Sequence, residues 1–240
     1  MNIFWDEEVP FIPLLGIQHL IYIFLMLSLL LLLITHIKEV KQHGTTIKKW
    51  ILVCSIGQQL LLYSWYIFET GFNVSESLPF HLSRISSLLG IIYLTSNNEK
   101  VLNVLFYFGL FAYGSFFYPQ RVYPIYHAIG ISFFINHAIT ILLPVFAGIA
   151  YDWYPHFRGV FKAYGWFLAY FIFVYFLNPI VDGNYFYLKY RPFFEHLNES
   201  LYVPLVLFAT LGIFLVGYFL SMLVVKLSLR NKIFTSVEKK

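Results

Sequence analysis

Long apolar stretches separated by short polar segments dominate this 240-residue chain. A helix that crosses a bilayer needs about 20 mostly apolar residues. The alternating segments of about 10 residues that are typical of a membrane β-barrel are absent from the sequence. The pattern therefore predicts an all-α fold, a polytopic membrane helix bundle of about seven helices in a single domain over residues 1–240. The predicted spans are residues 14–35, 50–68, 78–95, 101–118, 125–149, 163–180 and 203–226.

Composition supports the membrane assignment. Hydrophobic residues make up 59% of the chain and charged residues 12%, whereas about 25% of the residues in an ordinary soluble domain are charged. The formal net charge of +4 comes from basic residues that are dispersed over several loops rather than gathered in one stripe. We therefore predict membrane lipids as partners and no nucleic acid.

The basic residues fall mostly on one side of the predicted bundle. Cytoplasmic loops are enriched in Lys and Arg, so the richer side is expected to face the cytoplasm. The side that holds twelve of the sixteen basic residues comprises residues 36–49, 96–100, 150–162 and the tail from residue 226 onward. The other side holds Arg121, Lys189, Arg191 and the acidic run 6–8. This bias predicts an N-terminus outside the cell and a C-terminus in the cytoplasm.

Two ionisable residues, His81 and Arg84, lie in the apolar stretch 78–95. A charged side chain at bilayer depth costs about 3 kcal/mol or more unless it is paired or hydrated, so such residues usually have a function. Their spacing of three makes them neighbours on one side of a helix. We expect them to mark the functional site.

Further polar residues are expected at the same outer level of the bundle. Helix periodicity suggests that His127 and His137, ten residues apart, drift only modestly around their helix and line one cavity. The polar residues assigned to the outer half are Gln18, His19, Trp65, Glu69, His81, Arg84 and His127, with Asn136 and His137 deeper.

Each of these histidines alone can be explained as a hydrogen-bonded link between helices. Four histidines at one level with an arginine instead favour a functional cavity. His81, His127 and His137 offer three nitrogen ligands for zinc, but their spacing matches no ligand signature and a fixed arginine cation repels a metal. We therefore predict no metal and no cofactor, and a phosphate or carboxylate on Arg84.

The longest outer loop, residues 182–192, mixes aromatic and basic side chains, among them Asn184 and Tyr185. Such a mixture is typical of an interfacial belt. The alternative is a lid over the cavity that contacts a lipid head group.

Several motifs resemble the YwaF family of bacterial integral membrane proteins over nearly the whole chain. The most specific are Leu78-Pro-Phe-His-Leu82 and Gly183-Asn-Tyr-Phe-Tyr-Leu188. The others are Gly16-Ile-Gln-His-Leu20, Glu69-Thr-Gly-Phe72 and Phe133-Phe-Ile-Asn-His137. The resemblance implies a multi-pass protein of the bacterial plasma membrane.

That family is in turn similar to animal multi-pass acyltransferases that move fatty acyl chains between phospholipids and use a thiol near the corresponding histidine. Ser83 stands here where related bacterial proteins often have Cys. The resemblance therefore implies an acyltransferase or acyl hydrolase that acts on phospholipid or lipid-linked substrates from the outer leaflet. A serine needs an adjacent base to act as a nucleophile, and the alternative role of Ser83 is that of a small packing residue.

The residues predicted to take part divide into two groups. The catalytic candidates are His81, His127, His137 and Ser83, with a histidine as general base. The substrate-binding candidates are Arg84, Asn136, Asn184, Tyr185 and Glu69, with Asn136 or a protonated histidine placed to stabilise an oxyanion.

Two alternatives to an enzyme stay open at this stage. A transporter or a lipid-binding or small-molecule-binding protein can use the same cavity without covalent chemistry, although no convincing internal repeat of the kind common in transporters is present. A scaffold protein can use the polar cluster to specify helix packing.

Overall fold

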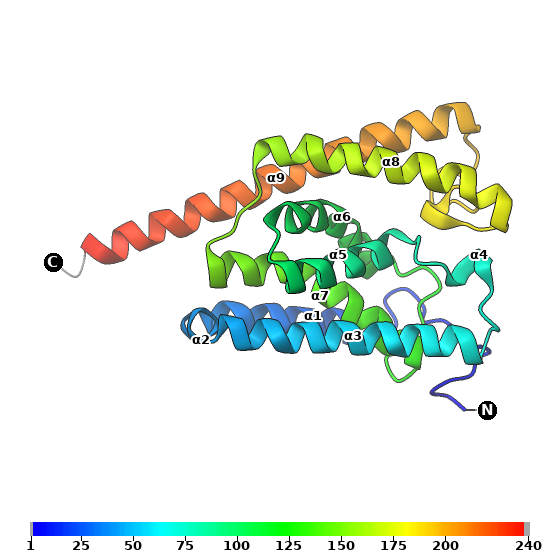
Figure 1. Cartoon of the computed structure of the whole chain (residues 1–240), viewed down its shortest axis with the longest axis horizontal. Coiled ribbons are helices and arrows are strands. Elements are labelled where there is room, and N and C mark those ends of the chain that lie inside the picture. Colours follow the sequence, from blue (N-terminus) through cyan, green and yellow to red (C-terminus); the bar gives the residue numbers. More distant parts are fainter. Residues whose placement is uncertain (1, 238–240) are drawn as a thin grey trace.

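The computed structural model describes residues 2–237, with side chains described as far as residue 227, and this part of the chain contains helices and no strand. Six helices are long and apolar enough to cross a membrane, and α5 is apolar but shorter. The prediction of an all-α polytopic bundle is thus confirmed (Figure 1). The elements are α1 Ile17–Thr35, α2 Ile37–Gln42, α3 Gly44–Phe68, α4 Val74–Ser77, α5 Leu82–Ser96, α6 Glu99–Phe117, α7 Ala128–Tyr151, α8 Phe157–Val181, η1 Tyr185–Tyr187 and α9 Glu199–Val237.

Every predicted span overlaps one of these helices, but the helix of the third span starts later than its apolar stretch. Leu78 is extended, with φ −62° and ψ 151°, because the ring of a following proline disfavours helical conformation in the residue before it. Pro79 therefore delays α5 until Leu82. As a result His81 is the N-cap residue of α5, and Arg84 lies in its first turn.

A short turn joins the C-terminus of α5 to the N-terminus of α6 and brings these two helices together. Asn97 closes α5 in the left-handed region, with φ 56°, which asparagine tolerates better than most residues. The Asn98 side chain then accepts a hydrogen bond of 3.0 Å from the backbone N–H of Lys100 and caps α6.

Helix α7 is the central element of the bundle. In its most apolar stretch 61% of the residues are buried, against 17% in α1 and in α9. It packs closely on α6 because Gly109 has no side chain: a Cβ there would lie 3.0 Å from Thr140 Cγ2 and 3.2 Å from Thr140 O. The polar residues of α7 are therefore held inside the bundle rather than facing lipid.

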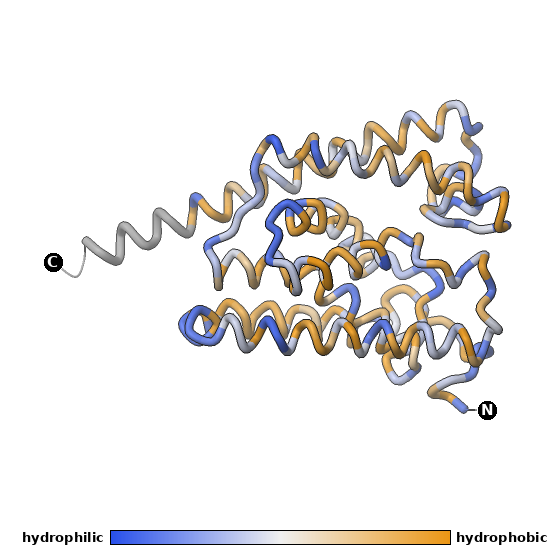
Figure 2. The backbone as a smooth tube through the Cα atoms, in the orientation of Figure 1, coloured by the Kyte–Doolittle hydropathy of each residue, from blue (hydrophilic) through white to orange (hydrophobic). Residues whose placement is uncertain are grey.

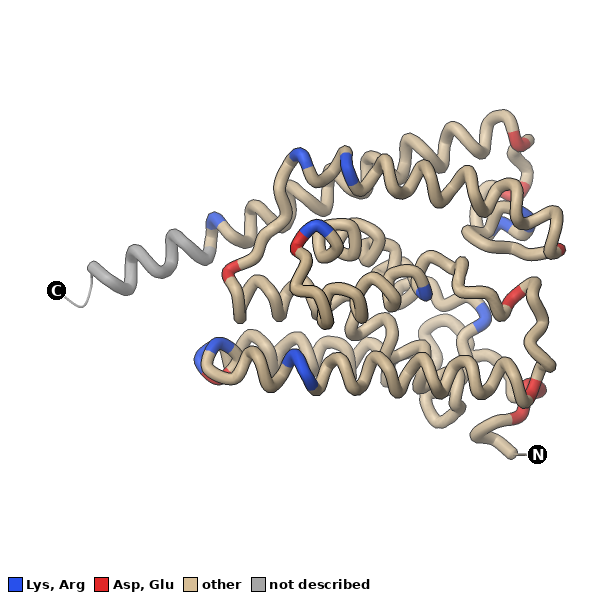
Figure 3. Tube along the Cα trace, viewed as in Figure 1, with Lys and Arg blue, Asp and Glu red and all other residues tan. Residues whose placement is uncertain are grey.

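Charge divides the bundle into two ends, which we call the acidic end and the basic end (Figure 3). The apolar residues of the long helices lie between them (Figure 2). The acidic end comprises residues 2–16, 69–81, 118–127 and 182–198, and the basic end comprises residues 36–49, 96–100 and 150–162. The two ends hold the loops that the sequence analysis assigned to opposite sides of the membrane. Which of the two ends faces the cytoplasm stays a prediction. Lys239 and Lys240 of the tail lie outside the described residues.

Candidate functional site

A cavity of about 600 Å³ opens at the acidic end. Its walls come from α3, α5 and α7, and the 182–198 loop covers it. Six of the nine predicted site residues line it. They are His81, Ser83, Arg84, Asn136, His137 and Asn184.

Arg84 is a buried cation without an anionic partner. Its side chain is 8% exposed, and one guanidinium nitrogen donates hydrogen bonds to the backbone carbonyls of Glu76 and Leu78, the latter at 2.8 Å. The other terminal nitrogen donates to the hydroxyl of Tyr66, whose ring also lies 4.7 Å from the guanidinium carbon. No carboxylate among the described side chains forms an ion pair with Arg84; Glu76 pairs with Arg121 at 3.3 Å and Asp182 with Lys189 at 2.5 Å.

Neutral oxygens hold the guanidinium in place but leave its charge uncompensated. A guanidinium has five N–H donors, and three are used here. The position in the first turn of α5 is also one where the helix dipole disfavours a cation and favours an anion. Arg84 in this cavity is therefore suited to bind an anionic group.

Hydrogen bonds separate the four histidines that were predicted to lie together at this end into two pairs. His19 Nδ1 accepts from the backbone of Leu15 at 3.0 Å and Nε2 donates to Phe116 O at 2.5 Å. His127 Nδ1 accepts from Ile129 N at 3.1 Å, and Nε2 donates to Asp6 O at 3.2 Å. Both nitrogens of each ring are thus occupied, and neither residue lines the cavity.

The helix start explains why His127 departs from its predicted place. Periodicity placed His127 and His137 on one helical face, but α7 begins at Ala128. His127 is the extended N-cap residue and its ring stacks on Tyr123 at 4.1 Å. It fastens the start of α7 to the N-terminal segment through Asp6.

His137 and His81 keep a free ring nitrogen. His137 Nδ1 lies 2.8 Å from Phe133 O, and because a carbonyl can only accept, Nδ1 carries the proton and Nε2 keeps its lone pair in the neutral ring. His81 makes no ring hydrogen bond to another described residue, and its ring packs edge-on against Tyr185 at 4.8 Å. Both residues border the cavity.

Polar side chains from α3 and α7 form one wall of the cavity. Asn136 accepts a bond from Thr140 through Oδ1 at 3.5 Å, and within the described part of the chain its amide nitrogen has no protein partner. Gln58 donates to Ser132 at 2.7 Å. The Asn136 amide is thus a free hydrogen-bond donor at the cavity wall.

The other candidate residues have different surroundings. Ser83 Oγ makes no hydrogen bond to a histidine in residues 2–227. Tyr185 is fully buried and donates to Val74 O at 2.7 Å, so it packs behind the cavity. Glu69, at the end of α3, accepts from Glu7 N at 3.3 Å and is not among the lining residues.

The 182–198 loop covers the cavity with seven side chains, including Asn184, Tyr187 and Arg191. Asn184 Oδ1 accepts from the backbone of Lys189 at 2.9 Å and of Tyr190 at 3.0 Å, which folds the loop back on itself. The hydrogen bond that Lys189 donates to the Asp182 carboxylate raises the pKa of Lys189, and burial raises the pKa of Tyr187. At neutral pH Lys189 is therefore charged and Tyr187 neutral.

Several residues of this site were not predicted, among them Tyr66 and Gln58. Tyr66 holds Arg84, and Gln58 lines the polar wall. Both lie in the stretch 50–68, where Gln58 was a visible signal as an amide inside an apolar helix. Tyr66 carried no such signal, because tyrosine is common in the membrane segments of this chain.

Comparison with known proteins places the chain in a family. A family model described as the TMEM164 family matches residues 14–223, a range that includes every cavity-lining residue except Phe11. The chain belongs to the TMEM164 family. No curated protein and no solved structure matches it. Membership in the TMEM164 family supports a multi-pass membrane protein, while the finer resemblance to YwaF proteins and to acyltransferases stays a prediction.

For a metal ion, this TMEM164-family chain offers no cluster of three or more His, Cys, Asp or Glu side chains within the residues that the structure describes. His81 and His137 share the cavity wall with Arg84. The cavity is thus lined by Arg84, two histidines and neutral hydrogen-bonding side chains, together with the charged residues Glu76, Arg121, Asp182, Arg191 and Glu195.

Proposed function

We propose that the cavity at the acidic end binds the anionic head group of a phospholipid or lipid-linked substrate and transfers an acyl chain from it, or hydrolyses it when water is the acceptor. The observation that carries this proposal is the Arg84 guanidinium, which is buried, held by neutral oxygens and free of any described carboxylate. A phosphate accepts two parallel hydrogen bonds from such a group. The resemblance to phospholipid acyltransferases supports the same chemistry.

His137 is the general base in this proposal. Its Nε2 takes the proton of the acceptor hydroxyl while the hydroxyl oxygen bonds to the ester carbonyl carbon, and the carbonyl electrons move onto the carbonyl oxygen. The Asn136 amide donates a hydrogen bond to that oxyanion. Collapse of the intermediate breaks the bond to the leaving alkoxide, which recovers the proton from His137.

Three other residues support these steps. His81 contacts the head group or the leaving oxygen from the N-terminus of α5. Ser83 lines the site as a small residue, since its hydroxyl makes no hydrogen bond to either cavity histidine within the described residues. Asn184 shapes the loop that covers the bound head group.

The predicted orientation determines the leaflet from which the substrate would enter the cavity. With the N-terminus outside, the acidic end faces the outer leaflet of a bacterial plasma membrane. The substrate then enters from that leaflet, and the 182–198 loop acts as a lid over it.

The test is acyl transfer in liposomes. The purified protein is incubated with phospholipid that carries a labelled acyl chain and an unlabelled lyso-acceptor. The wild type should form labelled product, and His137→Gln should lower the rate by at least about a hundredfold, the usual contribution of a general base. Arg84→Gln should chiefly weaken the apparent affinity for the anionic donor.

His156→Gln is the matched control, because His156 is an exposed histidine at the basic end. It should retain full activity. Undiminished turnover in a folded His137→Gln protein would falsify the mechanism. Saturable binding or movement of lipid without product would identify a transporter or lipid-binding protein instead.

A further inference from the structure

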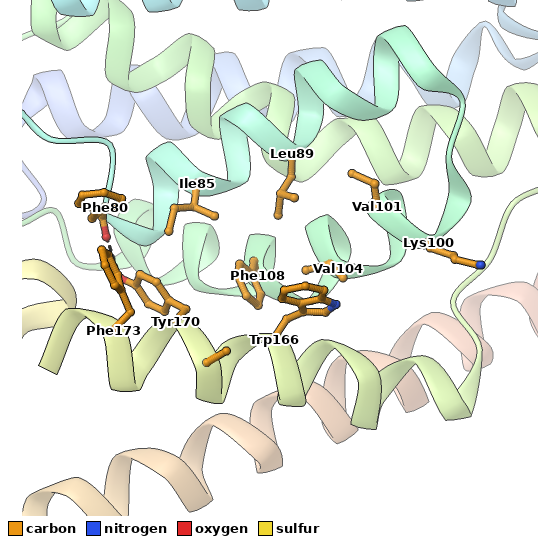
Figure 4. Close-up of a pocket in the computed structure, with 11 residues that line it drawn as sticks. Phe80, Ile85, Leu89, Lys100, Val101, Val104, Phe108, Trp166, Tyr170 and Phe173 are labelled. Carbon is orange, nitrogen blue, oxygen red and sulfur yellow. Dashed lines mark hydrogen bonds between the residues drawn. The ribbon is translucent and has the colours of Figure 1, made fainter. Parts of the chain in front are cut away.

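A second hollow, which we call the lateral groove, lies between α5, α6 and α8 on the side of the bundle. It has a volume of about 550 Å³, within the range of ligand sites in proteins. Figure 4 shows Phe80 at one end and Lys100 at the other. The groove thus extends along the helices, from near the acidic end towards the basic end.

The lateral groove is apolar except at one end. Lys100 is its one charged lining residue. The hydroxyl of Tyr170 is already used, because it donates to Phe80 O at 2.9 Å (Figure 4). The remaining surface is aliphatic and aromatic, so the groove suits a hydrocarbon chain rather than a polar ligand.

The length of the groove fits such a chain. Lys100 and Phe108 both line it and stand eight residues apart on α6, which corresponds to about 12 Å of helix rise. Phe80 extends the groove beyond Phe108 (Figure 4). A membrane acyl chain lies in the same direction, parallel to helices that cross the bilayer.

Positive charge gathers at one end only. Lys100 is exposed, and in Figure 4 its amine points away from the apolar residues, as expected for a lysine that reaches towards the membrane surface. Lys162, also exposed, lies one helical turn before Trp166 and so on the same face of α8. Neither lysine forms an ion pair with a described carboxylate, including the neighbouring Glu99.

We propose that the lateral groove binds one acyl chain of an anionic phospholipid from the leaflet at the basic end, with Lys100 and Lys162 against its phosphate. Basic residues between membrane helices bind anionic head groups in this way. Trp166, 65% exposed, lines the groove beside Val104, one helical turn after Lys162 on α8 (Figure 4).

This lipid site is separate from the polar cavity. The ring of Tyr185 packs against Phe80 of the groove at 6.0 Å and against His81 of the cavity at 4.8 Å. A fully buried side chain therefore stands between the two hollows. The inference does not depend on acyl transfer.

Trp166 provides a direct probe. The protein is reconstituted in phosphatidylcholine with a small fraction of lipid whose acyl chains are brominated, either phosphatidylglycerol or phosphatidylcholine. Bromine quenches tryptophan only on contact, and the signal of Trp166 is isolated by subtraction of Trp166→Phe. Quenching should reach half its maximum at a mole fraction of brominated phosphatidylglycerol at least about fivefold lower than for phosphatidylcholine, since one lysine near the surface contributes about that factor.

Paired variants separate the site from general membrane contact. Lys100→Gln with Lys162→Gln should remove the preference, while Lys38→Gln with Lys49→Gln, at the same end of the bundle on other helices, should keep it. Ala169→Phe fills the groove and should abolish quenching by either lipid at low mole fraction, whereas Ile172→Phe, on the lipid-exposed surface of α8, should not. Equal quenching by the two lipids in the wild type, or a preference unchanged by Lys100→Gln with Lys162→Gln, overturns the proposal.

Discussion

At the scale of single residues, hydrogen-bond partners decide which polar groups can react. Sequence spacing correctly marked His81, Arg84 and His137 as polar residues within apolar stretches, and the structure brings all three to one cavity. Sequence spacing could not reveal that His19 and His127 have both ring nitrogens occupied, because their partners Phe116 and Asp6 are about a hundred residues away in the chain. Long-range contacts of this kind leave no local pattern.

The role of Ser83 is a residue-scale prediction. Since its hydroxyl has no histidine partner among the described residues, we expect direct transfer to the acceptor, without an acyl-serine intermediate. Ser83→Ala should keep the rate of acyl transfer within about threefold of the wild type, whereas His137→Gln loses the contribution of a general base. Rapid-quench measurement of labelled protein gives a second readout. A labelled protein intermediate in the wild type, lost in Ser83→Ala together with activity, would show that Ser83 is the nucleophile.

At the scale of elements, helix starts determine where the site residues lie. Apolar runs predicted the existence of each spanning helix, but α5 begins four residues after the first residue of its apolar stretch because of Pro79, and α7 begins at Ala128. These two starts set the positions of His81 and His127 as N-cap residues. Hydropathy could not predict these two helix starts, since it measures the transfer of side chains from water and not the backbone conformation at which a helix begins.

His127 gives the prediction at this scale. Its ring caps α7 through Ile129 N and binds Asp6 O, so His127→Ala should lower the free energy of unfolding by about 1 kcal/mol or more, the usual cost of a lost cap. His127→Asn, which can still cap the helix, should recover part of the loss. Thermal unfolding in detergent measures both. The activity of the folded fraction should stay unchanged, and a selective loss of turnover without loss of stability would show that His127 belongs to the site.

At the scale of the whole molecule, the two ends of the bundle differ both in charge and in the kind of hollow that they carry. The polar cavity lies at the acidic end, and the lysines of the lateral groove lie at the basic end. The sequence predicted this division into two ends. Successive spans carry the chain from one side of the membrane to the other, so the Lys and Arg residues of alternate loops could be counted together for each side. A cavity at this end was predicted, but its shape could not be, since its covering loop is held by contacts such as Arg191 with Leu197 O at 2.7 Å.

Orientation in the membrane tests the molecule as a whole. In a Cys54→Ala background, Glu8→Cys at the acidic end and Lys38→Cys at the basic end each provide one thiol at an exposed position. A membrane-impermeant maleimide applied to intact cells should label Glu8→Cys and reach Lys38→Cys only after the cells are opened, because cytoplasmic loops are enriched in Lys and Arg. The reverse pattern would open the polar cavity to the cytoplasm and place the lateral-groove lysines at the outer leaflet. It would thereby exchange the leaflets from which the two proposed lipids are drawn, while leaving the chemistry proposed for Arg84 and His137 unchanged.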